Sequence, residues 1–77
     1  MPVTFSKGAL KEMSTRHISW DEVDSTLAQP DTISMDPDGN IVALKMIEEH
    51  VFRIAYKIDA GLRVVKKIEK TRQKRHL

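Results

Sequence analysis

The chain has 77 residues, no cysteine and a formal net charge of +2. This length predicts one small domain, and the lack of cysteine excludes disulfide bonds and thiolate metal sites and favours a reducing, cytoplasmic location. No apolar run approaches the ~20 residues of a membrane span, and the N-terminal residues lack the layout of a secretory signal, so we expect a soluble protein with no membrane contact.

The N-terminal part of the chain predicts a short extended segment followed by a helix. Residues 2–5 are β-prone and suit an extended lead-in or an edge strand. Ser6 fits a helix N-cap, and the helix is expected to end near residue 15. Its apolar stripe consists of Ala9, Leu10 and Met13.

A second helix with a clearer start signal follows at once. Ser19 and Glu22 have the spacing of a capping box, and Pro30 requires the helix to stop at about Gln29. We expect Trp20 to pack in the core, with a stacking platform or a partner anchor as the alternative. Trp20 shares its stripe with Val23 and Leu27.

The remainder of the chain predicts strands joined by turns. The expected strands cover residues 32–35, 41–47, 51–58 and 62 to about 68, with turns at 36–40, 48–50 and 59–61. The predicted fold is therefore α+β, with two short N-terminal helices packed on one face of a mostly antiparallel four-stranded meander sheet. We expect residues 1–69 to form this single domain and residues 70–77 to form a basic C-terminal tail.

The last hairpin, residues 51–68, organises this prediction because its first strand alternates strictly. Phe52, Ile54 and Tyr56 fall on one face together with Ile58, and this apolar face needs the helices as a cover. The opposite face carries Val51, Arg53, Ala55 and Lys57. The register of the following strand stays open, because Val64 and Val65 are both apolar.

Charge is unevenly distributed along the chain. Residues 1–62 hold six Lys or Arg against ten acids, a net charge of −4, whereas residues 63–77 hold seven against Glu69 alone, a net charge of +6. This asymmetry favours contact with a nucleic acid or an acidic protein near the C-terminus. The alternative is a solvated basic tail.

Cations are expected to gather on the outer face of the last hairpin. Arg53 and Lys57 share one strand face, and Arg63 and Lys67 are expected to project alike from the neighbouring strand. Four close cations repel one another unless an anion such as phosphate joins them. The alternative interpretation is that these Lys and Arg residues protect a solvent-facing strand pair from aggregation. The candidate nucleic-acid contacts are Arg16, Arg53, Lys57, Arg63, Lys66, Lys67, Lys70, Arg72, Lys74 and Arg75.

Catalysis would need a group that moves protons beside these cations. We take His17, Arg53 and Tyr56 as candidate catalytic residues for metal-free RNA cleavage, which needs cations around the charged phosphorane and a proton carrier. The three histidines lack metal-ligand spacing, and no phosphate-binding loop or dinucleotide fingerprint occurs, so we expect no metal and no cofactor.

The segment from Phe5 to Val23, followed by Leu27 and Gln29-Pro30-Asp31, resembles the start of a family of small bacterial and archaeal domains catalogued as domain of unknown function 4258. The hairpin segments 52–56 and 62–65 continue the likeness. That family is similar in layout to the RelE, ParE and BrnT toxins of toxin–antitoxin systems, compact α+β proteins that cleave messenger RNA or act on other targets. The chain departs from the family pattern at Gly8, where the family tends to have His, and at Glu12, where it tends to have Arg.

The sequence is compatible with three functions. The first is a toxin-like, RNA-interacting ribonuclease that acts on RNA or the ribosome and is held silent by an antitoxin-like partner. The second is a non-catalytic nucleic-acid binder that uses the same cations, and the third is a protein-interaction module. Self-association is also expected, because so small a sheet leaves edges open.

Overall fold

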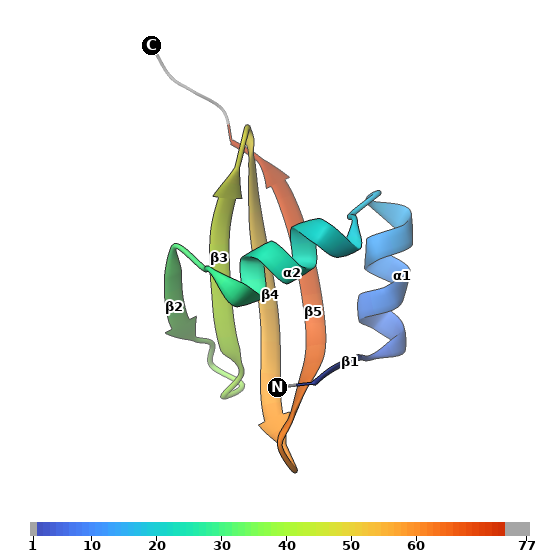
Figure 1. Cartoon of the computed structure of the whole chain (residues 1–77), viewed down its shortest axis with the longest axis vertical. Helices are drawn as coiled ribbons and strands as arrows, with labels where there is room; N and C mark the ends of the chain where they lie inside the picture. The colour runs from blue at the N-terminus through green and yellow to red at the C-terminus, as the bar shows by residue number, and fades with distance from the viewer. Residues whose placement is uncertain (1, 74–77) are drawn as a thin grey trace.

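The computed structural model describes residues 2–73 of the chain, which fold into two helices and five strands (Figure 1). The elements, in chain order, are β1 (Val3–Phe5), α1 (Lys7–Thr15), α2 (Trp20–Ala28), β2 (Thr32–Met35), β3 (Ile41–Ile47), β4 (His50–Asp59) and β5 (Leu62–Arg72). The α+β class and the order of the elements are those expected from the sequence.

The strands form one mixed sheet in the order β1-β5-β4-β3-β2. Strands β2 to β5 make the antiparallel meander that the sequence predicts. The prediction of a four-stranded sheet is incomplete, because β1 pairs in parallel with β5, with Val3 opposite Arg63 and Phe5 opposite Val65. The sheet therefore has five strands, and β1 and β2 lie at its two edges.

Both helices begin at the predicted caps. The Ser6 side chain accepts a hydrogen bond from the backbone N–H of Ala9 at 3.1 Å. At the start of α2, Ser19 Oγ accepts from the Glu22 N–H at 3.1 Å while Glu22 Oε1 accepts from the Ser19 N–H at 2.9 Å, which completes the capping box. These bonds satisfy N–H groups that a short helix otherwise leaves to water.

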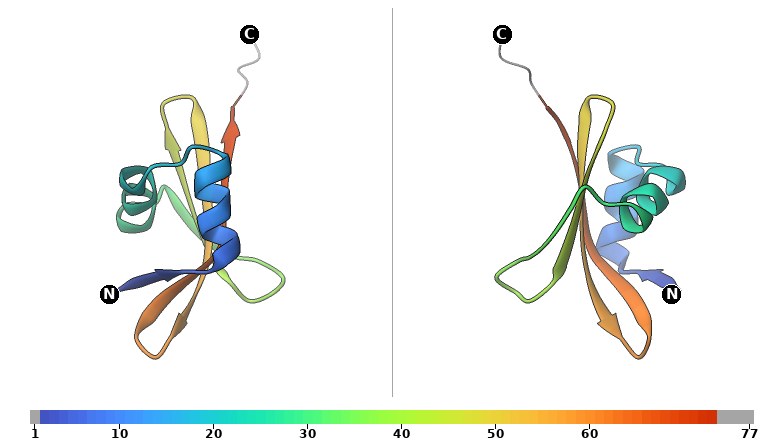
Figure 2. Two further views of the ribbon diagram at one scale, coloured as in Figure 1. Left: turned by 90° about the vertical axis from the view of Figure 1, so that its right-hand side faces the viewer. Right: turned by 60° about the vertical axis from the view of Figure 1, so that its left-hand side comes forward.

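The core lies between the helices and one face of the sheet (Figure 2). Phe52 and Ile54 of β4 are fully buried there and Tyr56 is nearly so, as the alternation of this strand predicts, whereas Ile58 on the same face is 53% exposed. The helices contribute Ala9, Met13, Val23 and Leu27 to the same cluster. Trp20 departs from expectation: its ring packs edge-on against Phe5 with centroids 5.1 Å apart, yet the residue stays 55% exposed.

Strand β5 differs most from its prediction. It continues to Arg72, so Lys70 and Arg72 belong to the sheet rather than to a tail. Its pairing with β4 shifts between Ala55 and Tyr56: Ala55 lies opposite Lys67, whereas Tyr56 lies opposite Val65. Lys66 is therefore an extra residue, a β-bulge that exchanges the faces of the residues on either side of it.

Candidate nucleic-acid interface

One face of the sheet carries no helix (Figure 2). We call it the open face and define it by Val42, Arg53, Ala55, Lys57, Lys67 and Glu69, which strand pairing places on the side opposite the core.

Long cationic side chains surround a small residue at the centre of the open face. Ala55 is fully buried although no helix covers it. It lies between Arg53 and Lys57 along β4 and opposite Val42 and Lys67 on the neighbouring strands. Aliphatic stems of Arg and Lys commonly cover apolar surface while their charged ends stay in water. These cations therefore have a packing role in addition to their charge.

Arg53 has carboxylates close to it. Its Nη1 donates to Glu69 Oε1 of β5 at 2.9 Å, and the two side chains are 38% and 52% exposed. Hydrogen bonds with Asn40 hold the pKa of the Asp36 carboxyl below its usual range, and the positive charge of Arg53 adds to this effect. Arg53 is thus partly neutralised.

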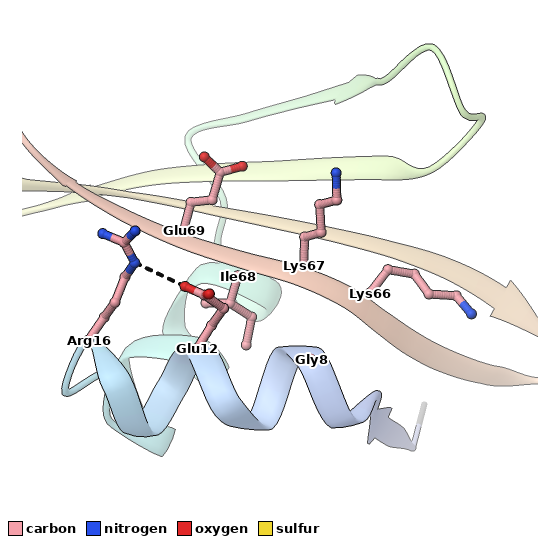
Figure 3. A pocket seen from close by; sticks show the side chains of 7 residues that line it. All are labelled: Gly8, Glu12, Arg16, Lys66, Lys67, Ile68 and Glu69. Atoms are coloured by element: carbon pink, nitrogen blue, oxygen red, sulfur yellow. Dashed lines mark hydrogen bonds and ion pairs between the residues drawn. The ribbon is translucent and has the colours of Figure 1, made fainter.

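A groove runs between α1 and the part of β5 that follows the bulge (Figure 3). Its volume is about 510 Å³, and we call it the α1–β5 groove. The α1 side presents positions four residues apart, which a helix brings to one face. The groove is lined by Gly8, Glu12, Arg16, Lys66, Lys67, Ile68 and Glu69.

The groove joins cations that are far apart in sequence. Arg16 comes from the end of α1, and Lys66 and Lys67 come from β5. Arg16 Nε donates to Glu12 Oε2 at 2.9 Å across one helical turn, a half-exposed pair of modest strength. Lys66 and Lys67 have no acid within ion-pair distance among residues 2–73.

Arg63 is not on the open face, and the prediction that it projects alongside Lys67 is wrong. The bulge at Lys66 turns Arg63 toward the helices, where its Cζ lies 5.4 Å from the centre of the Tyr56 ring. Its Nη1 donates to the Leu27 carbonyl oxygen at 3.4 Å. A cation near the last carbonyls of α2 also complements the helix dipole.

The other predicted cations are dispersed. Lys70 lies on the helix-bearing side, with Nζ 5.6 Å from the centre of the Phe52 ring. Arg72 donates to Glu49 Oε2 at 3.0 Å near the opposite end of the sheet from the β4–β5 turn. Lys74 and Arg75 lie outside the described residues.

The three candidate catalytic residues do not meet. Tyr56 is in the core, so the sheet separates it from Arg53 on the open face. His17 is exposed in the turn after α1, where it has a positive φ of 55° and directly follows Arg16. Two of the three have a groove residue as a neighbour: His17 follows Arg16 in the sequence, and Arg53 is bonded to Glu69.

Metal-ligand clusters and membrane-spanning helices are absent from the described part of the chain. Residues 2–73 contain no cluster of three or more His, Cys, Asp or Glu side chains that would hold a metal ion. Within the same range, neither helix has the length and apolar character needed to cross a bilayer.

Comparisons with family models, with curated proteins and with solved structures find no match to this chain.

Sequence reasoning missed three features of this region: the α1–β5 groove, the Glu69 partner of Arg53 and the inward turn of Arg63. The adjacent Val64 and Val65 were the available signal for the last of these, because a break in strict alternation is typical of a bulge. The groove had no local signal, since its walls lie about fifty residues apart.

Proposed function

We propose that this protein is a toxin-like RNA-binding protein that holds the phosphate backbone with the cations of the open face and the α1–β5 groove, without cleaving it. The observation that carries the proposal is the groove itself, a hollow of about 510 Å³ whose lining includes the three cations Arg16, Lys66 and Lys67 as well as the two acids Glu12 and Glu69. Backbone phosphates are spaced anions that suit such a row of exposed cations.

The charges favour binding over catalysis. Arg53 and Lys57 extend the basic surface from the groove across the open face, but Glu69 occupies one side of the Arg53 guanidinium. A phosphate would therefore meet Lys57, Lys66 and Lys67 first, since these three have no acidic partner among residues 2–73. Compact ammonium groups bind phosphate as point charges and do not select among bases.

The first prediction concerns the two groove lysines. Replacing Lys66 and Lys67 together with Ala should weaken binding to a labelled single-stranded RNA. It should also lower the magnitude of the slope of log K against log salt by about 1.4, that is ~0.7 for each phosphate that the variant no longer neutralises. Fluorescence anisotropy across a salt series measures both quantities.

The double variant Lys7→Ala, Lys11→Ala is the matched control. It removes the same charge from exposed positions of α1 that do not line the groove. The proposal fails if wild-type protein shows no binding at low salt, or if both double variants lose affinity equally.

A ribonuclease is the second candidate, and the place of His17 is the observation that favours it. His17 is exposed and directly follows Arg16, which lines the groove. Under this function His17→Ala abolishes cleavage but leaves RNA affinity unchanged, because His17 would move a proton while the groove cations hold the phosphates. RNA that stays intact with wild-type protein across pH 6–8 excludes this candidate while leaving the binding proposal in place.

An antitoxin-like protein partner would compete for the same surface. Its contact residues would be acidic, to complement Lys66 and Lys67. A partner that remains bound after nuclease treatment and releases RNA from the protein would place the two ligands on one surface.

A further inference from the structure

The two edges of the sheet are protected to different extents. At one edge, β1 pairs with the first half of β5 and α1 packs beside the second half (Figure 1). The other edge is β2, whose four residues are all exposed and which pairs with β3. Its outer side meets no other strand or helix in the described part of the chain.

The chemistry of β2 leaves this edge open to pairing. Natural edge strands are usually defended by Lys, Pro or a bulge. β2 has the sequence Thr-Ile-Ser-Met and carries no charge, with Ile33 55% and Met35 70% exposed. The opposite edge carries Lys66, Lys70 and Arg72, which would repel a second copy.

The hydrogen bonds of the β2–β3 hairpin fix which backbone groups point outward. The Asp36 N–H donates to the Asn40 carbonyl oxygen at 3.0 Å. Asp36 and Asn40 therefore form a hydrogen-bonded pair at the turn end of the β2–β3 hairpin, and the Asp36 N–H points toward β3. The N–H and C=O groups of successive residues in a strand point alternately to its two sides. Ser34 therefore bonds to β3, whereas the N–H and C=O groups of Ile33 and Met35 point away from the sheet.

We propose that β2 pairs with β2 of a second copy, antiparallel and about a two-fold axis through Ser34. In this register Ile33 of each copy lies opposite Met35 of the other. Each Ile33–Met35 pair exchanges both of its backbone hydrogen bonds, which gives four bonds in total. The same two pairs bring exposed apolar side chains together on the helix-bearing face, where Ile33 and Met35 both lie because their partners are Ala43 and Ile41.

Neighbouring registers are poorer for identifiable reasons. Shifting the second β2 strand by two residues in one direction places Asp31 opposite Met35. The Asp31 N–H, however, already donates to the Leu44 carbonyl oxygen at 2.7 Å. A shift in the other direction brings in Pro37, which has no N–H. In the proposed register Asp36 lies opposite Thr32, so no two like charges face each other.

A second copy suits this edge better than an unrelated strand, because the pairing is self-complementary and places no like charges opposite each other. Four residues on each side make a small interface, so we expect association that depends on protein concentration.

The test uses single cysteines in a chain that has none. Ser34 would face its own copy in a non-hydrogen-bonded pair, where Cα atoms are ~4.5 Å apart, within the range that a disulfide spans. The Ser34→Cys variant should therefore form a covalent dimer rapidly under mild oxidation. Thr32→Cys is the matched control: it lies on the same strand and face, but the proposed register displaces it from its copy by ~13 Å along the strand, and it should cross-link far more slowly.

Sedimentation velocity supplies an independent measurement. Wild-type protein should shift from monomer to dimer as concentration rises, and Met35→Pro should remain monomeric, because it removes an outward N–H without breaking a bond to β3. Circular dichroism checks that this variant is folded. Cross-linking of Thr32→Cys as fast as Ser34→Cys would overturn the register, and wild-type protein that stays monomeric at every concentration would overturn the pairing.

Discussion

Two arginines of adjacent strands reach opposite sides of the sheet. Arg53 lies on the open face beside Glu69, whereas Arg63 lies on the helix-bearing side over Tyr56. Both would have shared one face under regular alternation, and the single extra residue Lys66 separates them. A one-residue insertion thus removes one cation from the candidate RNA-binding surface and supplies the end of α2 with a positive charge.

The Asp36 carboxylate is expected to make the stability of the protein depend on pH. Its Oδ2 accepts from Asn40 Nδ2 at 2.9 Å, and its Oδ1 accepts from the N–H groups of Asp38 and Asn40 at 3.0 and 2.8 Å. Because these bonds lower the pKa of Asp36 in the folded state, its ionised form stabilises the fold above the pKa of the unfolded chain. This stabilisation is lost as the pH falls below about 4 and through the folded pKa.

Urea unfolding between pH 7 and pH 3 measures this effect. Asp36→Asn should be less stable than wild type at pH 7 and should lose less stability on acidification. Asp24→Asn, which removes a carboxylate from an exposed position of α2, serves as the control. Equal acid sensitivity of Asp36→Asn and wild-type protein would contradict the prediction.

At the scale of the elements, local signals predict local structure well. The cap residues Ser6 and Ser19 fix where the helices begin, and the Asp36–Asn40 turn fixes the β2–β3 hairpin. Pairings between distant segments were not predictable in this way. The parallel contact of β1 with β5 joins residues sixty positions apart, and the groove depends on both that contact and the bulge. RNA contact through Arg16, Lys66 and Lys67 stays a prediction, and the sequence alone did not indicate the groove that these three residues line.

Loss of the capping box of α2 is expected to destabilise the protein. Ser19→Ala removes the acceptor for the Glu22 N–H, and we expect a loss of about 1 kcal/mol in the free energy of unfolding. In so small a domain this corresponds to a fall in melting temperature of about 4–8 °C. Thermal unfolding measures it, with Glu22→Gln as the control, since Gln also completes a capping box. A melting temperature that is unchanged in Ser19→Ala would show that the box adds nothing.

At the scale of the whole molecule, the proposed pairing and the proposed RNA binding affect each other. A two-fold axis perpendicular to the sheet joins two five-stranded sheets edge to edge and keeps both helix layers on one side. Both open faces then point the same way, and their β4 strands lie five strand spacings apart, ~24 Å. One RNA strand long enough to cross that distance would contact both copies.

This geometry predicts a gain in affinity that depends on RNA length. Wild-type protein, at concentrations where it is dimeric, should bind an RNA of about twenty nucleotides at least ~10-fold more tightly than Met35→Pro does. An RNA of about four nucleotides, which is too short to cross the ~24 Å between the two open faces, should bind both proteins equally, since Met35 lies at the edge remote from the groove. Anisotropy titrations with the two RNAs measure, for each RNA, the ratio of the affinity of wild-type protein to that of Met35→Pro. If Met35→Pro loses affinity for the short RNA as well, the substitution has disturbed the RNA-binding surface itself. If the ratio is the same for both lengths while the wild type is dimeric, the two open faces do not act on one strand.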